Sequence, residues 1–121
     1  MLQLQTMGGA IDTSPQQYFN EVLPKIIEAQ REPCAKLGGT YGIKLFGEKG
    51  GAWTLDFPAA AVRPEVDAKV DFYLEMTAVD FIGMMKGSLD VEKAALAGKI
   101  RFEGDPRYFT NLAIVLKPAD D

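Results

Sequence analysis

Histidine is absent from the 121 residues of this chain, and cysteine and tryptophan each occur once. Without histidine the chain cannot form Ser-His-Asp or Cys-His catalytic groups, and it lacks both the usual zinc ligand and the commonest general base near neutral pH. An enzyme with this composition would have to use carboxylates, lysine or tyrosine. An enzyme therefore remains possible at this point, but no catalytic residue, metal site or cofactor is predicted from these residues.

The single cysteine, Cys34, cannot form a disulfide within the chain, so the usual signature of an oxidising compartment is missing. A buried small residue explains it more simply than a nucleophile. The N-terminal stretch lacks the basic start and long apolar core of a secretory signal, and no window reaches the roughly 18 apolar residues of a membrane span. These features predict a cytoplasmic protein without stable membrane insertion.

Concentrated positive charge is also missing: 13 basic residues face 17 acidic ones, for a net charge of -4, and the basic residues are scattered. Nucleic acid is a disfavoured partner because phosphate binding needs a basic patch. The composition, 47% hydrophobic and 25% charged, is typical of a globular protein. The length suits one domain, which we place at residues 13–118 after a flexible leader at residues 1–12.

Residues 14–32 have the pattern of an amphipathic helix, with apolar residues at helical spacing. Ser14 suits the N-cap and Pro15 the first helical position. Pro24 interrupts the stripe, and its missing amide hydrogen predicts a kink or two shorter helices that meet there. We expect Pro33 and Gly38-Gly39 to end the helical region.

The middle of the chain alternates apolar and polar residues, which is typical of strands with one buried and one wetter face. Alternation of this kind favours a mostly antiparallel sheet. The predicted strands are residues 40–47, residues 52–57, a short segment near Val62, and residues 70–76.

The pattern returns to helix after this region, with Thr77 and Asp80 placed as a variant of the capping box. The predicted elements are a helix from residue 77 to about residue 86, a helix at 91–97, a strand at 99–104 and a last helix that Asp105 and Pro106 begin. The order of elements predicts an α+β fold: one sheet whose apolar face is covered by helices.

The stretch VDFIGMMKGSLD, residues 79–90, is the most apolar of these helices. Helical spacing puts Phe81, Met84 and Met85 on one stripe. Packing on the sheet is the simpler interpretation of this stripe. The alternative is the wall of a ligand site, because methionines adapt to irregular apolar shapes and the alanine-rich helix that follows can leave a void.

Carboxylates offer the remaining route to catalysis. Asp56, Asp71 and Glu75 take outward positions by alternation, so we expect a solvated face for them. Asp80 is explained by capping. A small enzyme that uses Asp56 or Asp80 is the least favoured hypothesis.

The segment AVDFIGMMKGSLDVEKAALAGKIRFEGD, residues 78–105, resembles the core of the sterol carrier protein 2 domain family, and the likeness extends over roughly residues 14–117. Upstream, Trp53 and Asp56 match the pattern of the family's tryptophan-containing strand. The residues that carry the resemblance downstream are Asp80, Phe81, Met84, Met85, Gly87, Ala94, Leu96, Gly98, Lys99, Ile100, Phe102 and Gly104.

The resemblance implies a single five-stranded, mostly antiparallel sheet with helices on one face, enclosing an apolar tunnel. It implies a lipid-binding domain at residues 13–118 that binds, transfers or presents a fatty acid, acyl-CoA, sterol or phospholipid without catalysis. The alternative is a protein-interaction module or homodimer with the same fold and a filled core. The ligand-binding residues that the resemblance implies are Trp53, Phe81, Ile82, Met84, Met85, Leu89, Leu96, Ile100, Phe102, Phe109 and Leu112.

Overall fold

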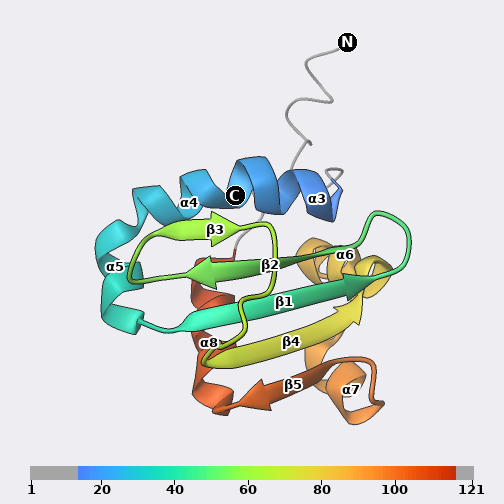
Figure 1. Ribbon diagram of the computed structural model, residues 1–121. Helices are drawn as coiled ribbons and strands as arrows, with labels where there is room; N and C mark the ends of the chain where they lie inside the picture. The colour runs from blue at the N-terminus through green and yellow to red at the C-terminus, as the bar shows by residue number, and fades with distance from the viewer. Residues whose placement is uncertain (1–13, 117–121) are drawn as a thin grey trace.

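The computed structural model describes residues 14–116, which form a five-stranded sheet in the order β3-β2-β1-β4-β5 with helices against it (Figure 1). The leader predicted at residues 1–12 lies outside the described residues. The strands are β1 Thr40–Phe46, β2 Gly51–Asp56, β3 Ala61–Arg63, β4 Phe72–Thr77 and β5 Arg101–Gly104.

The predicted fold class is confirmed, and the sheet is mixed rather than purely antiparallel. Three of its strand pairs are antiparallel, and the central pair, β1 with β4, is parallel. Ile43 lies opposite Trp53 on one side and Leu74 on the other. Because side chains alternate along a strand, the odd positions of β1 and β2 and the even positions of β4 share the apolar face.

Helices cover this apolar face, and α6 and α8 lie behind the sheet in the view of Figure 1. All the helical regions predicted after residue 76 are present. The helical segments are α3 Pro15–Gln17, η1 (a π-helical turn) Tyr18–Val22, α4 Leu23–Ala29, α5 Arg31–Leu37, α6 Ala78–Lys86, α7 Val91–Leu96 and α8 Pro106–Val115.

The N-terminal helical region ends at Gly38, as predicted for Gly38-Gly39, but Pro33 does not end it, because α5 continues to Leu37. Pro33 is the third residue of α5, where a backbone N–H has no partner within the helix, so proline costs little there. Pro24 likewise occupies the second position of α4, directly after the π-helical turn.

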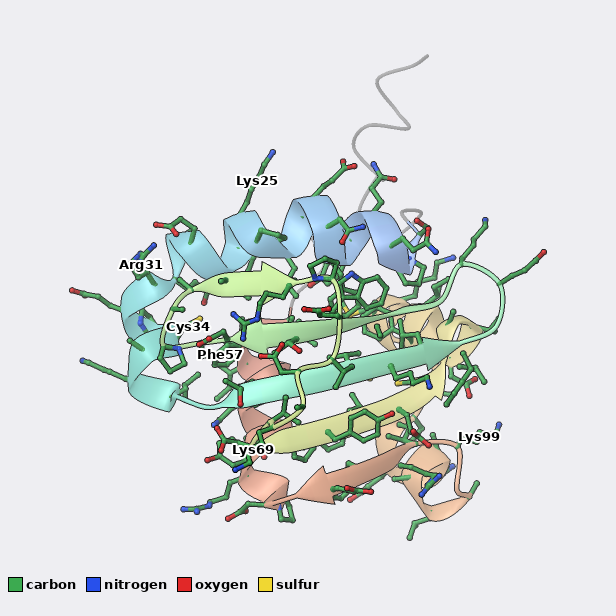
Figure 2. All side chains as sticks on the ribbon, in the orientation of Figure 1. Lys25, Arg31, Cys34, Phe57, Lys69 and Lys99 are labelled. Atoms are coloured by element: carbon green, nitrogen blue, oxygen red, sulfur yellow. The ribbon has the colours of Figure 1, made fainter. Side chains whose placement is uncertain are left out.

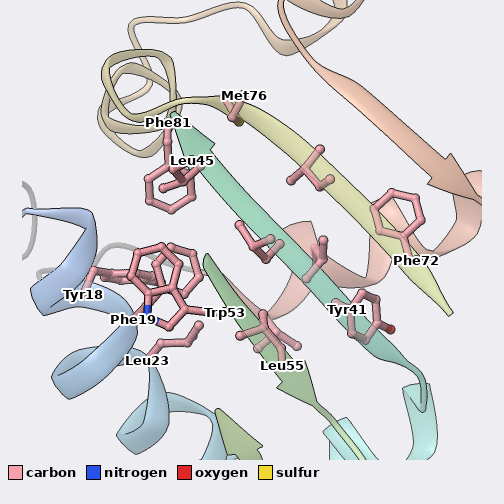
Figure 3. Close-up of a cluster of buried hydrophobic side chains, with 14 of the residues drawn as sticks. Tyr18, Phe19, Leu23, Tyr41, Leu45, Trp53, Leu55, Phe72, Met76 and Phe81 are labelled. Atoms are coloured by element: carbon pink, nitrogen blue, oxygen red, sulfur yellow. The ribbon is translucent and has the colours of Figure 1, made fainter. Parts of the chain in front are cut away.

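The core lies between the sheet and the N-terminal helical run, where aromatic side chains meet (Figure 3). Phe19 stacks on Trp53 with ring centroids 4.4 Å apart, and Phe81 lies 5.3 Å from Phe19. Cys34 is fully buried, as expected of a small packing residue. Between residues 14 and 116, no helix has the length and hydropathy to cross a bilayer.

The opposite face of the sheet is crossed by the connection from β3 to β4, residues 64–71 (Figure 1). This crossover is tied to the sheet by Thr54, whose side chain is fully buried. The Thr54 hydroxyl donates to the Glu65 carbonyl at 2.6 Å and accepts from the Asp67 amide at 2.8 Å. The crossover leaves the apolar face to the helices.

Candidate functional site

Helix α6 begins and ends where the sequence places its caps. The Thr77 hydroxyl accepts from the Asp80 amide at 3.0 Å, and Gly87 ends the helix in the left-handed conformation with φ of 81°. Asp80 lies in the first turn, and the side chain that caps the helix is that of Thr77.

Phe81 fixes the first turn of α6 on the N-terminal helical run. Its side chain is 2% exposed and packs against Tyr18 and Phe19 (Figure 3). Met84 and Met85 follow one turn later, beyond this anchor, and are half-buried. The methionines therefore lie where α6 leaves the aromatic core.

Helix α8 is held in place by contacts with Tyr41 of β1, which are separate from the aromatic contacts that hold α6. The Tyr41 hydroxyl donates to the Gly38 carbonyl at 2.6 Å and accepts from Asn111 Nδ2 at 3.3 Å, and its ring meets Tyr108 edge-on. Burial raises the pKa of Tyr41 to about 12, so the hydroxyl stays protonated at neutral pH. The Asp105 carboxylate caps the start of α8.

A cleft of about 410 Å³ separates α6 from α8 and is partly open to solvent. The described residues that line it carry no charged side chain, and Thr110 is the one with a hydroxyl. Leu74 of β4 forms the floor. The lining residues are Leu74, Met84, Met85, Phe109, Thr110, Leu112, Ala113 and Leu116.

Small side chains on α8 explain the open space. Thr110 and Ala113 stand one helical turn apart on the flank of α8 that borders the cleft. They cannot fill the gap to Met84 and Met85. The small side chains of α8 therefore explain the open space, whereas the sequence analysis expected a void beside the alanines of α7.

The structure brings four of the predicted ligand-binding residues together in this cleft: Met84, Met85, Phe109 and Leu112. Trp53 and Phe81 belong to the aromatic core instead, and the Trp53 indole N–H donates to Asn20 Oδ1 at 2.9 Å. The other predicted residues lie outside the lining.

Ile100 is buried, and Ile82 and Leu89 are half-buried. Phe102 points to the apolar face, stacked on Phe72 with centroids 5.6 Å apart, but it stays 38% exposed because β5 is an edge strand. Leu96 is 88% exposed, since α7 turns Ala94 inward and Leu96 away from the protein. Leu96 therefore has no place in the cleft wall.

The lining also includes Leu74, Thr110, Ala113 and Leu116, which are absent from the set that the family resemblance implied. Leu74 was detectable as an apolar-face residue by strand alternation. The spacing of Phe109, Ala113 and Leu116 is the i, i+4, i+7 pattern of one helix face and could have marked the flank of α8.

Two of the candidate carboxylates, Asp56 and Glu75, lie on the opposite face of the sheet in structural roles, and Asp80 lies in the first turn of α6. Asp56 pairs with Arg63 at 3.3 Å, and Glu75 pairs with Arg101 at 2.9 Å and accepts from the Tyr73 hydroxyl at 2.7 Å. None of them lines the cleft. Within the described residues, no group of acidic or cysteine side chains could hold a metal ion.

Comparison with known families gives this cleft a context. Residues 19–117 match the family described as the SCP-2 sterol transfer family. The chain belongs to this family. Members of this family bind and transfer lipids.

Among curated relatives, human sterol carrier protein 2 is 28% identical over 92 residues, which is 72% of this chain and 17% of the human protein. The crystal structure of sterol carrier protein 2 like 2 from Aedes aegypti has a TM-score of 0.59 at 24% identity, covering 76% of this chain and 94% of that chain. The palmitated form of the same protein in solution has a TM-score of 0.52 at 22% identity, covering 75% of this chain and 91% of that chain.

These likenesses confirm the family and the fold. Because the two solved structures are less than 25% identical to this chain, they support the fold alone. The chain spans 17% of the length of the human relative, so the activity of that whole protein does not transfer to it directly. The enclosed tunnel is not shown, since the described residues form a cleft that is partly open, and it stays a prediction.

Proposed function

We propose that the cleft between α6 and α8 binds the apolar part of a lipid, and that the domain carries or presents this lipid without altering it. One observation carries the proposal: a cleft of about 410 Å³ whose described lining is apolar except for Thr110. This volume is within the range of small-molecule sites, about 300–1,000 Å³. A charged head group would stay at the open side, because burying an unpaired charge is costly.

A single acyl chain, in a fatty acid or an acyl-CoA, is the ligand that we favour. Met84 and Met85 are unbranched and adapt to a flexible chain. The palmitated Aedes aegypti relative shows that this fold occurs with such a chain attached or bound. A sterol or a phospholipid with two long chains would need a differently shaped or larger space.

The expected affinity follows from the burial of methylene groups. Each one contributes about 0.8 kcal/mol, so a long acyl chain gains on the order of 10 kcal/mol before costs. Loss of translational freedom and the ordering of the chain remove several kcal/mol. Roughly micromolar binding is the natural result.

The proposal includes no chemical step. The described lining holds no carboxylate, lysine or tyrosine, so it offers no general acid or base. A protein-interaction module with a filled core fits less well, because the core is filled around the cleft and not within it. We place the protein in the cytoplasm, in keeping with its lone buried cysteine.

Displacement of a fluorescent fatty acid from the purified protein tests the proposal, together with native mass spectrometry for lipid that co-purifies. We expect Met85→Asp to weaken probe binding at least tenfold, because it puts a charge in the apolar wall. Ala113→Phe provides a second variant without added charge, and it should block binding by filling the cleft.

Val79→Asp is the matched control, because Val79 is on the same helix, is 75% exposed and does not line the cleft. It should bind the probe like the wild-type protein. The proposal fails if the wild-type protein displaces no probe at about tens of micromolar and carries no lipid. It also fails if both cleft variants bind as well as Val79→Asp does.

A further inference from the structure

Strand β5 forms one border of the sheet. The strand order ends in β3 on one side and in β5 on the other, and Figure 1 shows β5 beyond β4. All four residues of β5 are exposed. In an edge strand, every second residue directs its backbone N–H and C=O groups away from the neighbouring strand, where they can pair with another strand. The outer side of β5 is therefore a surface for strand pairing.

The other border, β3, is less available for pairing. It has three residues and lies against α4. Its Arg63 is already paired with Asp56 at 3.3 Å and with Asp67 at 2.6 Å. Edge strands are commonly protected by proline, by a covering element or by charge. Strand β5 contains no proline and packs against β4, so its charged side chains decide which strand can pair with it.

The charges along β5 are antisymmetric about Phe102. The sequence KIRFEGD, residues 99–105, has two basic residues before Phe102 and two acidic residues after it, at alternate positions. Arg101 and Glu103 share one face of the sheet, and Phe102 lies on the other face. A second copy that is rotated by half a turn about Phe102 runs antiparallel to the first, so Arg101 meets Glu103 of the second copy and Glu103 meets its Arg101. The strand is complementary to itself.

We propose that β5 pairs with β5 of a second copy of this chain, in an antiparallel register centred on Phe102. An interface between two identical surfaces requires a patch that is complementary to itself, and the antisymmetric charges of β5 meet this requirement. Pairing joins the two sheets into one and gives hydrogen-bond partners to the outward backbone groups of both strands.

The ion pairs within one copy fit this register. Arg101 is paired with Glu75 of β4 at 2.9 Å, whereas Glu103 forms no ion pair within residues 14–116. Pairing of the two copies gives each Glu103 an Arg101 directly opposite and places each Arg101 between two carboxylates. Opposite charges across paired strands are stabilising. Lys99 and Asp105 continue the pattern beyond the ends of β5.

The net charge of this border neither drives nor prevents the contact. The charged residues at or beside it are Glu75, Arg101 and Glu103 of the sheet, Lys69 and Asp71 of the crossover, Lys99, Asp105 and Arg107 at the ends of β5, and Asp90, Glu92 and Lys93 of α7. These charges nearly cancel in each copy. Asp105 is also paired with Arg107 at 2.8 Å, so the two inner pairs of Arg101 with Glu103 contribute most.

Other registers are less favourable. A shift by two residues puts Arg101 opposite Arg101 or Glu103 opposite Glu103, and like charges directly opposite are destabilising. A shift by one residue sets the apolar face of one copy beside the polar face of the other. In the proposed register the two Phe102 rings lie directly opposite each other. Because Phe102 is 38% exposed in one copy, this aromatic pair covers apolar surface that the single chain leaves open.

The contact does not involve the cleft, since Arg101, Phe102 and Glu103 are not among its lining residues. Self-association is therefore independent of the proposed lipid binding. Glu103→Arg should bind the fluorescent fatty acid like the wild-type protein, and Met85→Asp should associate like the wild-type protein. The two proposals fail separately.

Sedimentation velocity of the purified protein over a series of concentrations tests the inference. We expect an equilibrium between monomer and dimer with a dissociation constant of about 100 µM, because pairing of one short strand is at the small end of specific interfaces. Arg101→Glu and Glu103→Arg should each weaken self-association at least tenfold, because either change makes both inner pairs like-charged.

A mixture of these two variants separates loss of pairing from loss of folding. The strand of Arg101→Glu is acidic at both inner positions and that of Glu103→Arg is basic at both, so in the mixed pair all the inner contacts are attractive again. Native mass spectrometry, which distinguishes the mixed dimer by its mass, should detect it in preference to either homodimer. A variant that had only failed to fold would not regain association in this way.

Charge reversals away from β5 are the matched controls. Lys25 is exposed on α4, away from Lys99 and the start of β5 (Figure 2). Glu48 is exposed in the loop between β1 and β2. Lys25→Glu and Glu48→Arg should each associate like the wild-type protein.

Cross-linking tests the register itself. Phe102→Cys should form a disulfide-linked dimer under mild oxidation, because Cβ atoms directly opposite each other in paired strands are about 4.5–5.5 Å apart. Glu103→Cys should form it at least tenfold more slowly, because the two copies of this position are diagonal neighbours about 7–8 Å apart. The natural Cys34 is buried and does not compete.

Three outcomes would overturn the inference. The first is a wild-type protein that stays monomeric at several times the expected dissociation constant. The second is a dimer that Arg101→Glu and Glu103→Arg form as readily as the wild-type protein does. The third is a mixture of these two variants that yields no mixed dimer, or cross-linking that is as fast at residue 103 as at residue 102.

Discussion

Tyr41 joins three parts of the domain through one hydroxyl group. Its oxygen contacts the Gly38 carbonyl at the end of α5 and the Asn111 amide on α8, while its ring packs in the core of β1. Strand alternation predicts that this ring faces the core, and it does. No sequence pattern predicts Asn111 as the partner, because the two residues are 70 positions apart.

Alkaline pH should weaken the fold through this residue. Burial raises the pKa of Tyr41 from its ordinary value of 10.0 to about 12. A raised pKa in the folded state means that the neutral tyrosine contributes its full stability below pH 10 and loses it as the pH rises through 12. We expect the free energy of unfolding in urea to fall across this range.

In Tyr41→Phe the free energy of unfolding should decrease less steeply with rising pH. The variant should also be less stable at neutral pH, because the Gly38 carbonyl loses its hydrogen-bond donor. Burial also raises the pKa of Tyr73 to about 12, so the dependence on pH should shrink without vanishing. Urea unfolding of both proteins over a series of pH values gives the comparison. If the free energy of unfolding fell equally steeply with pH in both proteins, Tyr41 would not be a source of the pH dependence.

Helix α6 shows how far local sequence specifies an element. Its cap at Thr77 and its end at Gly87 follow from side-chain and backbone preferences of a few residues, and both were predictable. Proline normally ends a helix, which made Pro33 a predicted boundary, but it lies in the first turn of α5, where it costs little, and the helix continues to its cap at Gly38.

The cleft was less predictable than the helices that border it. Spacing indicated that Met84 and Met85 share a stripe, but their exposure depends on the gap to α8. That gap is set by contacts far apart in sequence, such as Phe81 on Phe19 and Asn111 on Tyr41. The family resemblance supplied the class of ligand and only part of the lining, namely Met84, Met85, Phe109 and Leu112.

Gly83 offers a test at the scale of the helix. A Cβ at Gly83 would lie 3.4 Å from Ser88 Oγ and 3.5 Å from Leu89 Cβ, which are ordinary contacts. Gly83→Ala should therefore stabilise the domain by up to about 1 kcal/mol, through better helix propensity, and raise the melting temperature by roughly 4 °C. Thermal unfolding followed by circular dichroism measures this.

Gly87→Ala is the paired control, because it makes the same change in the same helix at a φ of 81°. It should cost about 1 kcal/mol, since the left-handed conformation is unfavourable for alanine. If Gly83→Ala lowered the stability instead, the added methyl group would have less space beside Ser88 than the 3.4 Å contact indicates.

At the scale of the whole molecule, the parallel pairing of β1 with β4 requires the chain to cross the sheet before it enters β4. Alternating sequence predicted antiparallel strands, and it could not distinguish one parallel pair among them, because both arrangements have the same side-chain period. A parallel neighbour requires a crossover. Residues 64–71 supply it without a helix, over the face that the helices leave open.

The buried hydroxyl of Thr54 makes two of the hydrogen bonds that tie the crossover to the sheet. Thr54→Val keeps the shape of the side chain but leaves the Glu65 carbonyl and the Asp67 amide without their partner. Each such group costs about 1–3 kcal/mol when it is buried, so we expect a loss of about 2 kcal/mol or more in urea unfolding. Thr110→Val, at an exposed position of α8, should change stability by less than about 0.5 kcal/mol. A similar small effect of Thr54→Val would mean that water satisfies the crossover and that the parallel pair holds without it.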